Sequence, residues 1–194
     1  MLRSVIISGP PAIGKTTIAK GLAKEFDLKY LSGGDVLKDM AKEQGFVTDR
    51  EDFWDTNAGM NFLSIRKGNP EFDKQVDERL EKIFLNDNVI ITSYTLPWLV
   101  RDGVKIWLAG SQEASAKRMT IRDHISIESA LEIVKKRYEE NKMLYKKLYG
   151  FNFGDDLSVF DTAIDTDGLG PDQVLEQAKK AARNFYDSKT TPRS

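Results

Sequence analysis

The chain has 194 residues, no cysteine and one histidine, and its 29 Lys and Arg residues nearly balance 30 Asp and Glu, for a net charge of −1. The missing cysteines exclude disulfide frameworks and thiolate metal sites, a single histidine excludes a multi-histidine zinc site, and the balanced charge argues against a nucleic-acid partner. No segment approaches the roughly 20 apolar residues that span a bilayer and no signal-peptide pattern is found, so we expect a cytoplasmic protein without a membrane partner.

The predicted elements alternate between short apolar runs and amphipathic segments. The chain starts with a strand at residues 3–8, a helix at 16–26, a short strand at 30–32 and a helix at 35–44. After residues 45–69, the least regular stretch, the pattern predicts a helix from residue 69, strands at 88–92 and 104–108, helices at 111–122 and 127–148, a strand at 159–165 and a helix at 171–186. Residues 188–194 are polar and are expected to form a flexible tail.

The order of these elements predicts the fold class. Each strand is a continuous apolar run, which is typical of a parallel sheet that is covered by helices on both faces. We therefore predict a single α/β domain over residues 1–187, with three αβα layers around a parallel five-stranded sheet.

Residues 9–16 read Gly-Pro-Pro-Ala-Ile-Gly-Lys-Thr and fit the phosphate-loop pattern G-x-x-x-x-G-K-[ST] at every fixed position. A strand precedes this segment and a helix follows it, as the pattern requires. Backbone N–H groups of such a loop point at phosphates, Lys15 would place its charge on the outer phosphates, and the Thr16 hydroxyl can ligate Mg²⁺. Ala12 and Ile13 stand where glycine and serine are more usual, which predicts a stiffer loop. The expected nucleotide site comprises Gly9, Pro10, Pro11, Ala12, Ile13, Gly14, Lys15, Thr16 and Thr17.

Two large classes with this loop fit poorly. A GTPase would carry an Asn-Lys-x-Asp motif that reads the base, and the chain has none. An ATPase would end a strand in an acidic residue, whereas the run Val89-Ile90-Ile91 is followed by Thr92-Ser93-Tyr94.

Further segments resemble the nucleoside monophosphate kinases. The run Gly34-Asp35-Val36-Leu37-Lys38 looks like the Gly-Asp-x-x-Arg acceptor motif of that family. Arg118 and Arg122, four residues apart on one helix face, resemble its Arg-x-x-x-Arg at the lid, where the first arginine stacks on the ATP adenine and the second reaches the phosphates. Residues 137–150, 156–161, and 69–73 with Asp77 are similar to the archaeal-type (type 2) cytidylate kinases.

The resemblance implies a P-loop NTPase fold with a helical acceptor-binding segment at 33–86 and a lid at 118–150. It implies phosphoryl transfer from ATP, with Mg²⁺, to a nucleoside monophosphate, most of all CMP or dCMP, by a monomer. Such an acceptor is already an oxyanion, so positioning and charge neutralisation replace a strong base. The resemblance assigns catalytic roles to Lys15, Arg122 and Arg137, ATP binding to the phosphate loop and Arg118, the metal to Thr16, and acceptor binding to Asp35, Lys38, Arg66, Asp73 and Tyr94.

The chain departs from the family pattern at three cationic positions. Lys38 replaces the arginine of the acceptor motif and loses its bidentate fork. Thr92-Ser93-Tyr94 stands where these kinases have Glu-Gly-Arg. Leu144 replaces an arginine expected seven residues after Arg137, on the same helix face, so we expect its side chain to point where that arginine would.

Three interpretations remain open. In the first, the reaction is unchanged and Arg66, Lys67, Arg79 or Arg101 supplies the missing charge. In the second, the acceptor is a different small molecule: residues 33–101 hold nine Lys and Arg against 13 Asp and Glu, and a hydroxyl acceptor would use Asp35 as a base. In the third, the domain binds nucleotides without turnover.

Overall fold

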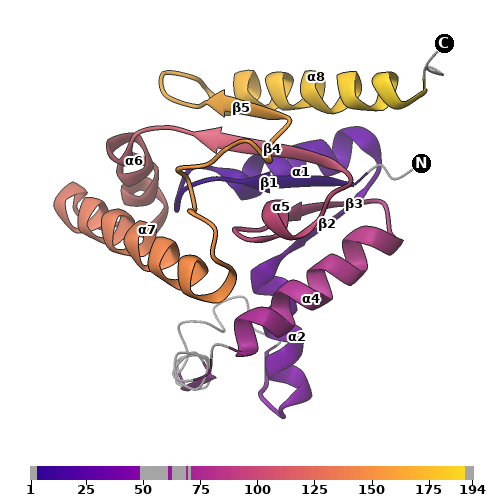
Figure 1. Ribbon diagram of the computed structural model, residues 1–194. Coiled ribbons are helices and arrows are strands. Elements are labelled where there is room, and N and C mark those ends of the chain that lie inside the picture. Colours follow the sequence, from indigo (N-terminus) through magenta and orange to yellow (C-terminus); the bar gives the residue numbers. More distant parts are fainter. Residues whose placement is uncertain (1–3, 49–60, 63–68, 70, 191–194) are drawn as a thin grey trace.

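The computed structural model describes residues 4–48, 61, 62, 69 and 71–190. Its five strands form one parallel sheet in the order β2-β3-β1-β4-β5 (Figure 1). The strands are β1 (Val5–Ser8), β2 (Lys29–Ser32), β3 (Val89–Thr92), β4 (Val104–Ala109) and β5 (Thr162–Asp165). The predicted parallel five-stranded α/β sheet is confirmed.

Helices connect the strands, and three of their differences from the predicted helices have a structural consequence. A short helix, α5, was not predicted, because four residues are too few to show a helical period. The helix α2 begins at Gly33, two residues before its predicted start, because the side chain of Ser32 caps it. The helix α8 continues to Thr190, into the segment expected as a tail. The helices are α1 (Lys15–Phe26), α2 (Gly33–Glu43), α4 (Glu71–Asn86), α5 (Leu96–Leu99), α6 (Gln112–Asp123), α7 (Ile127–Tyr149) and α8 (Pro171–Thr190).

The sheet separates two apolar cores. Side chains alternate between its faces, so Val5 and Ile7 of β1 pack with α1 and α8, whereas Ile6 packs with α2, α4 and α5. All three are fully buried. Figure 1 shows α8 on one side of the sheet and α4 on the other. The three-layer arrangement follows directly from these continuous apolar strands.

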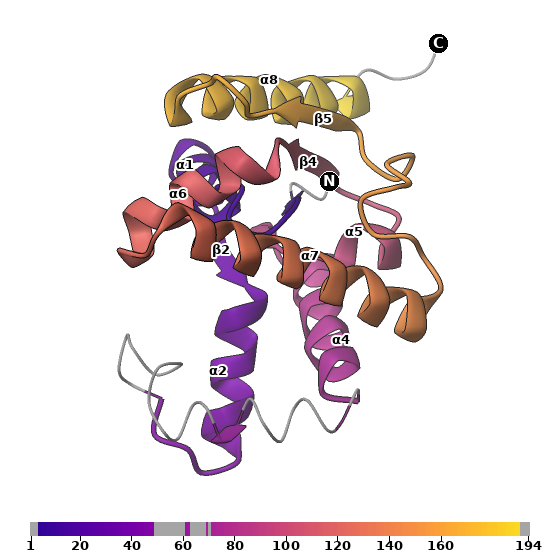
Figure 2. The same cartoon turned by 90° about the vertical axis from the view of Figure 1, so that its left-hand side faces the viewer.

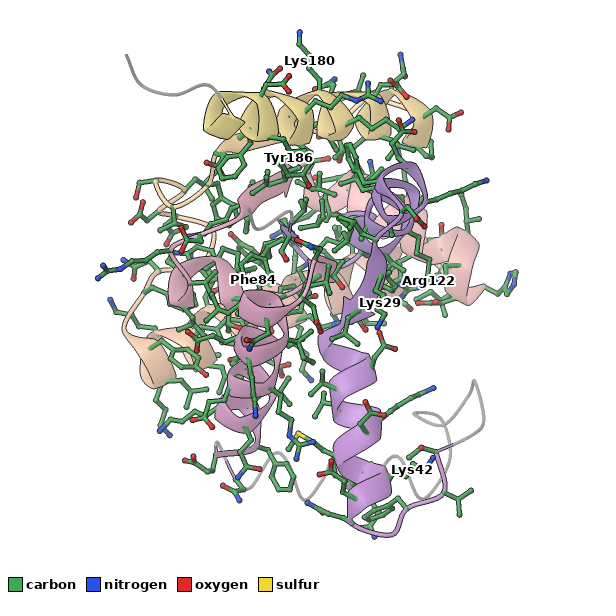
Figure 3. All side chains as sticks on the ribbon, turned by 90° about the vertical axis from the view of Figure 1, so that its right-hand side faces the viewer. Lys29, Lys42, Phe84, Arg122, Lys180 and Tyr186 are labelled. Carbon is green, nitrogen blue, oxygen red and sulfur yellow. The ribbon has the colours of Figure 1, made fainter. Side chains whose placement is uncertain are left out.

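The helix α8 is amphipathic, with one face on the sheet and one in solvent. Tyr186 points toward the sheet, where its ring meets Phe26 edge to face at 5.6 Å between centroids, while Lys180 points outward (Figure 3). The helices α2 and α4 pack against each other and project from the sheet (Figure 2). Phe84 anchors α4 in the core and is fully buried, and Lys42 lies at the distal end of α2 (Figure 3).

An aromatic cluster fixes the second half of α7 against the sheet. Trp107 of β4 and Tyr145 of α7 both contact Phe153 edge to face, at 5.4 and 5.7 Å between ring centroids. Trp98 of α5 stacks on Phe151 at 4.4 Å with an interplanar angle of 3°. The strand β4, the helix α5 and the segment that follows α7 thereby hold the end of α7 in place.

All five strands run in one direction, so the loops after them gather at the same edge of the sheet. These loops begin at Ser8, Ser32, Thr92, Ala109 and Asp165. Within the described part of the chain, no helix has the length and apolar character that crossing a membrane requires.

Candidate active site

Two cavities open at the carboxyl edge of the sheet, and the first, the donor cavity, has a volume of about 740 Å³. It lies between the phosphate loop, α6 and the start of α8. No carboxylate is among the described residues that line it, whereas four cations are, so the cavity matches a polyanion. The lining residues are Ala12, Ile13, Gly14, Lys15, Thr16, Thr17, Ile18, Tyr94, Arg118, Met119, Arg122, Arg137, Thr166, Leu169, Pro171 and Val174.

The phosphate loop has a tightly packed beginning. Gly9 has a φ of 148°, and a Cβ atom there would lie 2.4 Å from the carbonyl oxygen of Leu108, so only glycine fits. Ile13 is 2% exposed and belongs to the core. Ala12 has a φ of 58°, in the left-handed region that costs a non-glycine residue about 1 kcal/mol. Gly9, Pro10 and Pro11, also predicted to bind ATP, are not among the residues that line this cavity.

Lys15 points back into its own loop. Its Nζ atom donates to the carbonyl oxygens of Gly9 at 3.0 Å and Pro10 at 2.6 Å, and lies 4.5 Å from the ring centroid of Tyr94. Burial lowers the pKa of Lys15, and Tyr94 partly opposes that shift. The ammonium group is therefore held beside both cavities by neutral partners that a phosphate can replace.

The two arginines of the predicted lid differ in their partners. Arg118 donates through Nη2 to both oxygens of Thr166 at 3.1 Å, and its buried Nη1 has no hydrogen-bond partner among the described residues. Arg122 donates through Nε and Nη2 to the two carboxylate oxygens of Asp123, at 2.6 and 2.7 Å. This pair raises the pKa of Arg122 and lowers that of Asp123. Asp123 thus engages the Nε and Nη2 atoms of Arg122, a residue that lines the cavity.

The residues of the donor cavity fit a magnesium ion that is held mainly by the nucleotide. The exposed Thr16 lines the cavity next to Lys15. The described residues contain no group of three or more His, Asp or Glu side chains placed to hold a metal. Since Mg²⁺ keeps several waters and commonly binds through substrate phosphates and few protein oxygens, Thr16 is the residue that would hold it.

The second cavity, the acceptor cavity, has a volume of about 450 Å³. It lies between α2, α4, the loop after β3 and α7. Lys15, Tyr94 and Arg137 line both cavities and form what we call the junction. The acceptor cavity is lined by Lys15, Ser32, Gly33, Gly34, Leu37, Asp73, Val76, Asp77, Leu80, Thr92, Ser93, Tyr94, Thr95, Arg137, Glu140, Asn141 and Tyr145.

Tyr94 sits at the centre of the junction. Burial would raise the pKa of Tyr94, but the positive charges of Lys15 and Arg137 and hydrogen bonding with Lys15 and Asn141 outweigh it, so the pKa is lowered. The position at which the family resemblance predicted an arginine thus holds a phenol beside two cations.

The remaining acceptor residues predicted from sequence are only partly brought together. Asp73 lines the acceptor cavity. Asp35 and Lys38 do not: Asp35 accepts hydrogen bonds from the backbone N and the Oγ of Ser32, both at 2.7 Å, and so completes the capping box of α2. Arg66 lies outside the described residues.

Leu144 does not point where the sequence predicted. It is half-buried and packs in the aromatic cluster with Trp107 and Phe153, and it does not line the acceptor cavity. Leu144 and Arg137 share one face of α7. At Leu144, seven residues after Arg137, that face packs against the aromatic cluster.

Asp77 is a cavity residue whose side-chain role the sequence did not predict. Its carboxyl group is buried, at 6% exposure, on the same face of α4 as Asp73, and lines the acceptor cavity. The four-residue spacing from Asp73 is visible in the sequence. The hydroxyl groups that hold the Asp77 carboxylate come from Thr95 and Tyr149, which are distant in the sequence.

A family model described as the cytidylate kinase-like family matches residues 4–168. The cytidylate kinase of Sulfurisphaera tokodaii is 34% identical over 176 residues, which cover 88% of this chain and 89% of that protein. The cytidylate kinase of Ignicoccus hospitalis is 34% identical over 178 residues, covering 91% and 96%. The predicted family is confirmed.

Solved structures agree on the fold. A protein from Eubacterium ventriosum superposes with a TM-score of 0.68 at 15% identity, covering 94% of this chain and 99% of that one. A shikimate kinase from Bacteroides thetaiotaomicron superposes with a TM-score of 0.56 at 14% identity, covering 93% and 98%. At these identities the likeness concerns the fold alone, which is that of the P-loop kinases.

Proposed function

The chain belongs to the cytidylate kinase-like family and is a nucleoside monophosphate kinase; from this premise we propose that it transfers the terminal phosphoryl group of ATP to CMP. The observation that carries the proposal is the junction, where Lys15, Tyr94 and Arg137 line both cavities. A phosphoryl group passing from one cavity to the other has to cross this point.

The donor cavity supplies charge rather than covalent chemistry. We assign the ATP phosphates to the phosphate loop and Lys15, and the nucleoside end to Arg118, whose Nη1 is buried without a partner among the described residues. A magnesium ion held by Thr16 and the phosphates would neutralise charge on the donor. Arg122 and Arg137 then stabilise the charge that develops during transfer.

The acceptor cavity needs no general base when the acceptor is a monophosphate. A phosphate oxygen is already a nucleophile, whereas a hydroxyl acceptor requires a base within hydrogen-bond reach. Asp35, the candidate base, is engaged by Ser32 and does not line the cavity. Asp35 is therefore not placed to act as the base that a hydroxyl acceptor would need. We assign acceptor contacts to Asp73, Tyr94 and Arg137.

The test is a coupled assay of ADP release from ATP and Mg²⁺. The purified chain is given CMP, dCMP, UMP, AMP or a panel of hydroxylated metabolites. We expect CMP to have the highest kcat/KM, with dCMP next. Absence of turnover with every monophosphate would contradict the proposal, and turnover of a hydroxyl compound instead would establish the changed-acceptor interpretation.

A further inference from the structure

Asp77 is a buried carboxyl group inside the acceptor cavity, where an unsatisfied acid would be costly. Its Oδ1 accepts a hydrogen bond from Thr95 Oγ1 at 2.5 Å, and its Oδ2 accepts one from the hydroxyl of Tyr149 at 2.7 Å. The three residues come from α4, the loop after β3 and the end of α7. The carboxyl group is therefore fixed in orientation by two elements besides its own.

Asp77 lines the acceptor cavity between Thr95, which directly follows the junction residue Tyr94, and Tyr149 at the far end of α7. Arg137 marks the junction on α7, and Tyr149, which touches Asp77, lies 12 residues further along the same helix. At 1.5 Å per residue, this separation is about 18 Å along the helix axis. Asn141 and Tyr145 line the cavity between them. An acceptor with its phosphate at the junction thus extends toward Asp77.

The hydrogen bonds set what Asp77 can recognise. Burial and the Asp77 carboxylate raise the pKa of Tyr149, so its hydroxyl remains a donor at neutral pH. Both carboxyl oxygens already act as acceptors, and such a group attracts a further N–H or O–H donor and repels a carbonyl oxygen. Cytosine carries an amino group at the ring position where uracil carries a carbonyl oxygen.

We propose that Asp77 is a specificity-determining residue of the acceptor cavity, and that it accepts a hydrogen bond from the exocyclic amino group of the acceptor base. Thr95 and Tyr149 are positioning residues that hold the carboxylate in place. This inference rests on the proposed function, because it takes CMP as the acceptor.

The test compares kcat/KM for CMP, UMP and dCMP in the wild type and Asp77→Asn. An amide presents an N–H donor to the base where the carboxylate presents only acceptors, so we expect the CMP-to-UMP ratio to fall at least about tenfold. The CMP-to-dCMP ratio and the KM for ATP are expected to stay within about twofold. Glu78→Gln is the matched control: it makes the same change on the next residue of α4, which is exposed and outside the cavity lining. It is expected to leave every ratio unchanged.

Two outcomes overturn the inference while CMP turnover by the wild type stands. An equal loss for all three acceptors would make Asp77 structural, and a shift confined to the CMP-to-dCMP ratio would assign it to the ribose. Tyr149→Phe gives a second measure, because it keeps the carboxylate but removes one of its holders. It is expected to lower the CMP-to-UMP ratio about two- to fivefold, and an unchanged ratio would count against the proposal even if Asp77→Asn failed to fold. A wild type without CMP turnover would instead refute the proposed function.

Discussion

The ammonium group of Lys15 lies over the ring of Tyr94, with Nζ 4.5 Å from the ring centroid. The same atom donates to the carbonyl oxygens of Gly9 and Pro10. Lys15 is thus held in place by groups that carry no full negative charge. An incoming phosphate offers a stronger partner than any of the three.

The Tyr94 phenol is expected to ionise at lower pH than an ordinary tyrosine, because the cations beside it outweigh its burial. A phenolate-absorbance titration of the wild type minus that of Tyr94→Phe isolates this group. A bound non-hydrolysable ATP analogue adds negative charge at the junction and should move the titration to higher pH. A lowered pKa contributes folding stability above about pH 10 and loses it as the pH falls through the folded value, so stability near neutrality should not depend on this proton. Superimposable titration curves for the two proteins would contradict the assignment.

Lys15→Ala is expected to reduce turnover by at least about 10³-fold while the fold is retained. The substitution removes the charge nearest the transferred group but leaves the core intact. Circular dichroism and thermal unfolding check the fold. Lys24→Ala is the control, because Lys24 is exposed in the last turn of the same helix. Activity of Lys15→Ala within a few-fold of the wild type would show that this loop is not the donor site.

Asp123→Asn should help ATP binding by weakening the hold on Arg122. An exposed ion pair is worth about 0.2–1 kcal/mol, so the KM for ATP is expected to fall by a factor of about 1.4 to 5. Asp155→Asn makes the same chemical change outside the predicted lid, where it breaks the 3.0 Å pair with Lys142. An equal drop in KM in both variants would mean that Arg122 is not specifically restrained.

Leu144→Arg introduces the arginine that the family resemblance predicted at this position, yet we expect it to be harmful. Leu144 packs in the aromatic cluster, and placing a guanidinium group there costs about 1–3 kcal/mol of folding free energy. CMP turnover should not rise. Met143→Arg, at a side chain that is 64% exposed, should leave stability nearly unchanged. A gain in CMP kcat/KM by Leu144→Arg without loss of stability would show that this position serves the acceptor.

Gly9→Ala should reduce the free energy of unfolding by about 2 kcal/mol or more. The new Cβ would meet the carbonyl oxygen of Leu108 at 2.4 Å. Gly45→Ala isolates backbone strain, since Gly45 also has a positive φ, of 85°, but nothing lies within 4 Å of its Cβ position; it should cost about 1 kcal/mol. Urea unfolding measures both. Similar losses of unfolding free energy in the two variants would contradict a destabilising contact between the new Cβ of Gly9→Ala and Leu108.

The parts of the fold that could be predicted are those with local signals. Each strand is a short apolar run, and the phosphate loop follows a fixed spacing, so the sheet and the donor site were accessible from sequence. The helix α5 has four residues, which is below one useful period of the apolar pattern. The Ser93 hydroxyl just before it accepts from the N–H groups of Thr95 and Leu96, a pattern that also occurs in many non-helical turns.

The acceptor side was harder to predict because its residues have tertiary partners. Asp35 looks like a site residue in the sequence, but a serine three residues earlier turns it into part of a helix cap. Leu144 and Arg137 share a helix face, and only the aromatic cluster separates their environments. Asp77 depends on hydroxyls from residues 95 and 149, and no local pattern announces those contacts.

The junction makes the two substrates effectors of one another. Lys15, Tyr94 and Arg137 line both cavities, so the charge brought by one ligand changes the field that the other meets. Linkage then requires reciprocity: whatever factor ATP applies to the affinity for CMP, CMP applies to the affinity for ATP. A substitution at any of these three residues therefore changes the dissociation constant for ATP, the dissociation constant for CMP and the coupling between them. Separating these three quantities requires each ligand to be titrated in the presence and in the absence of the other.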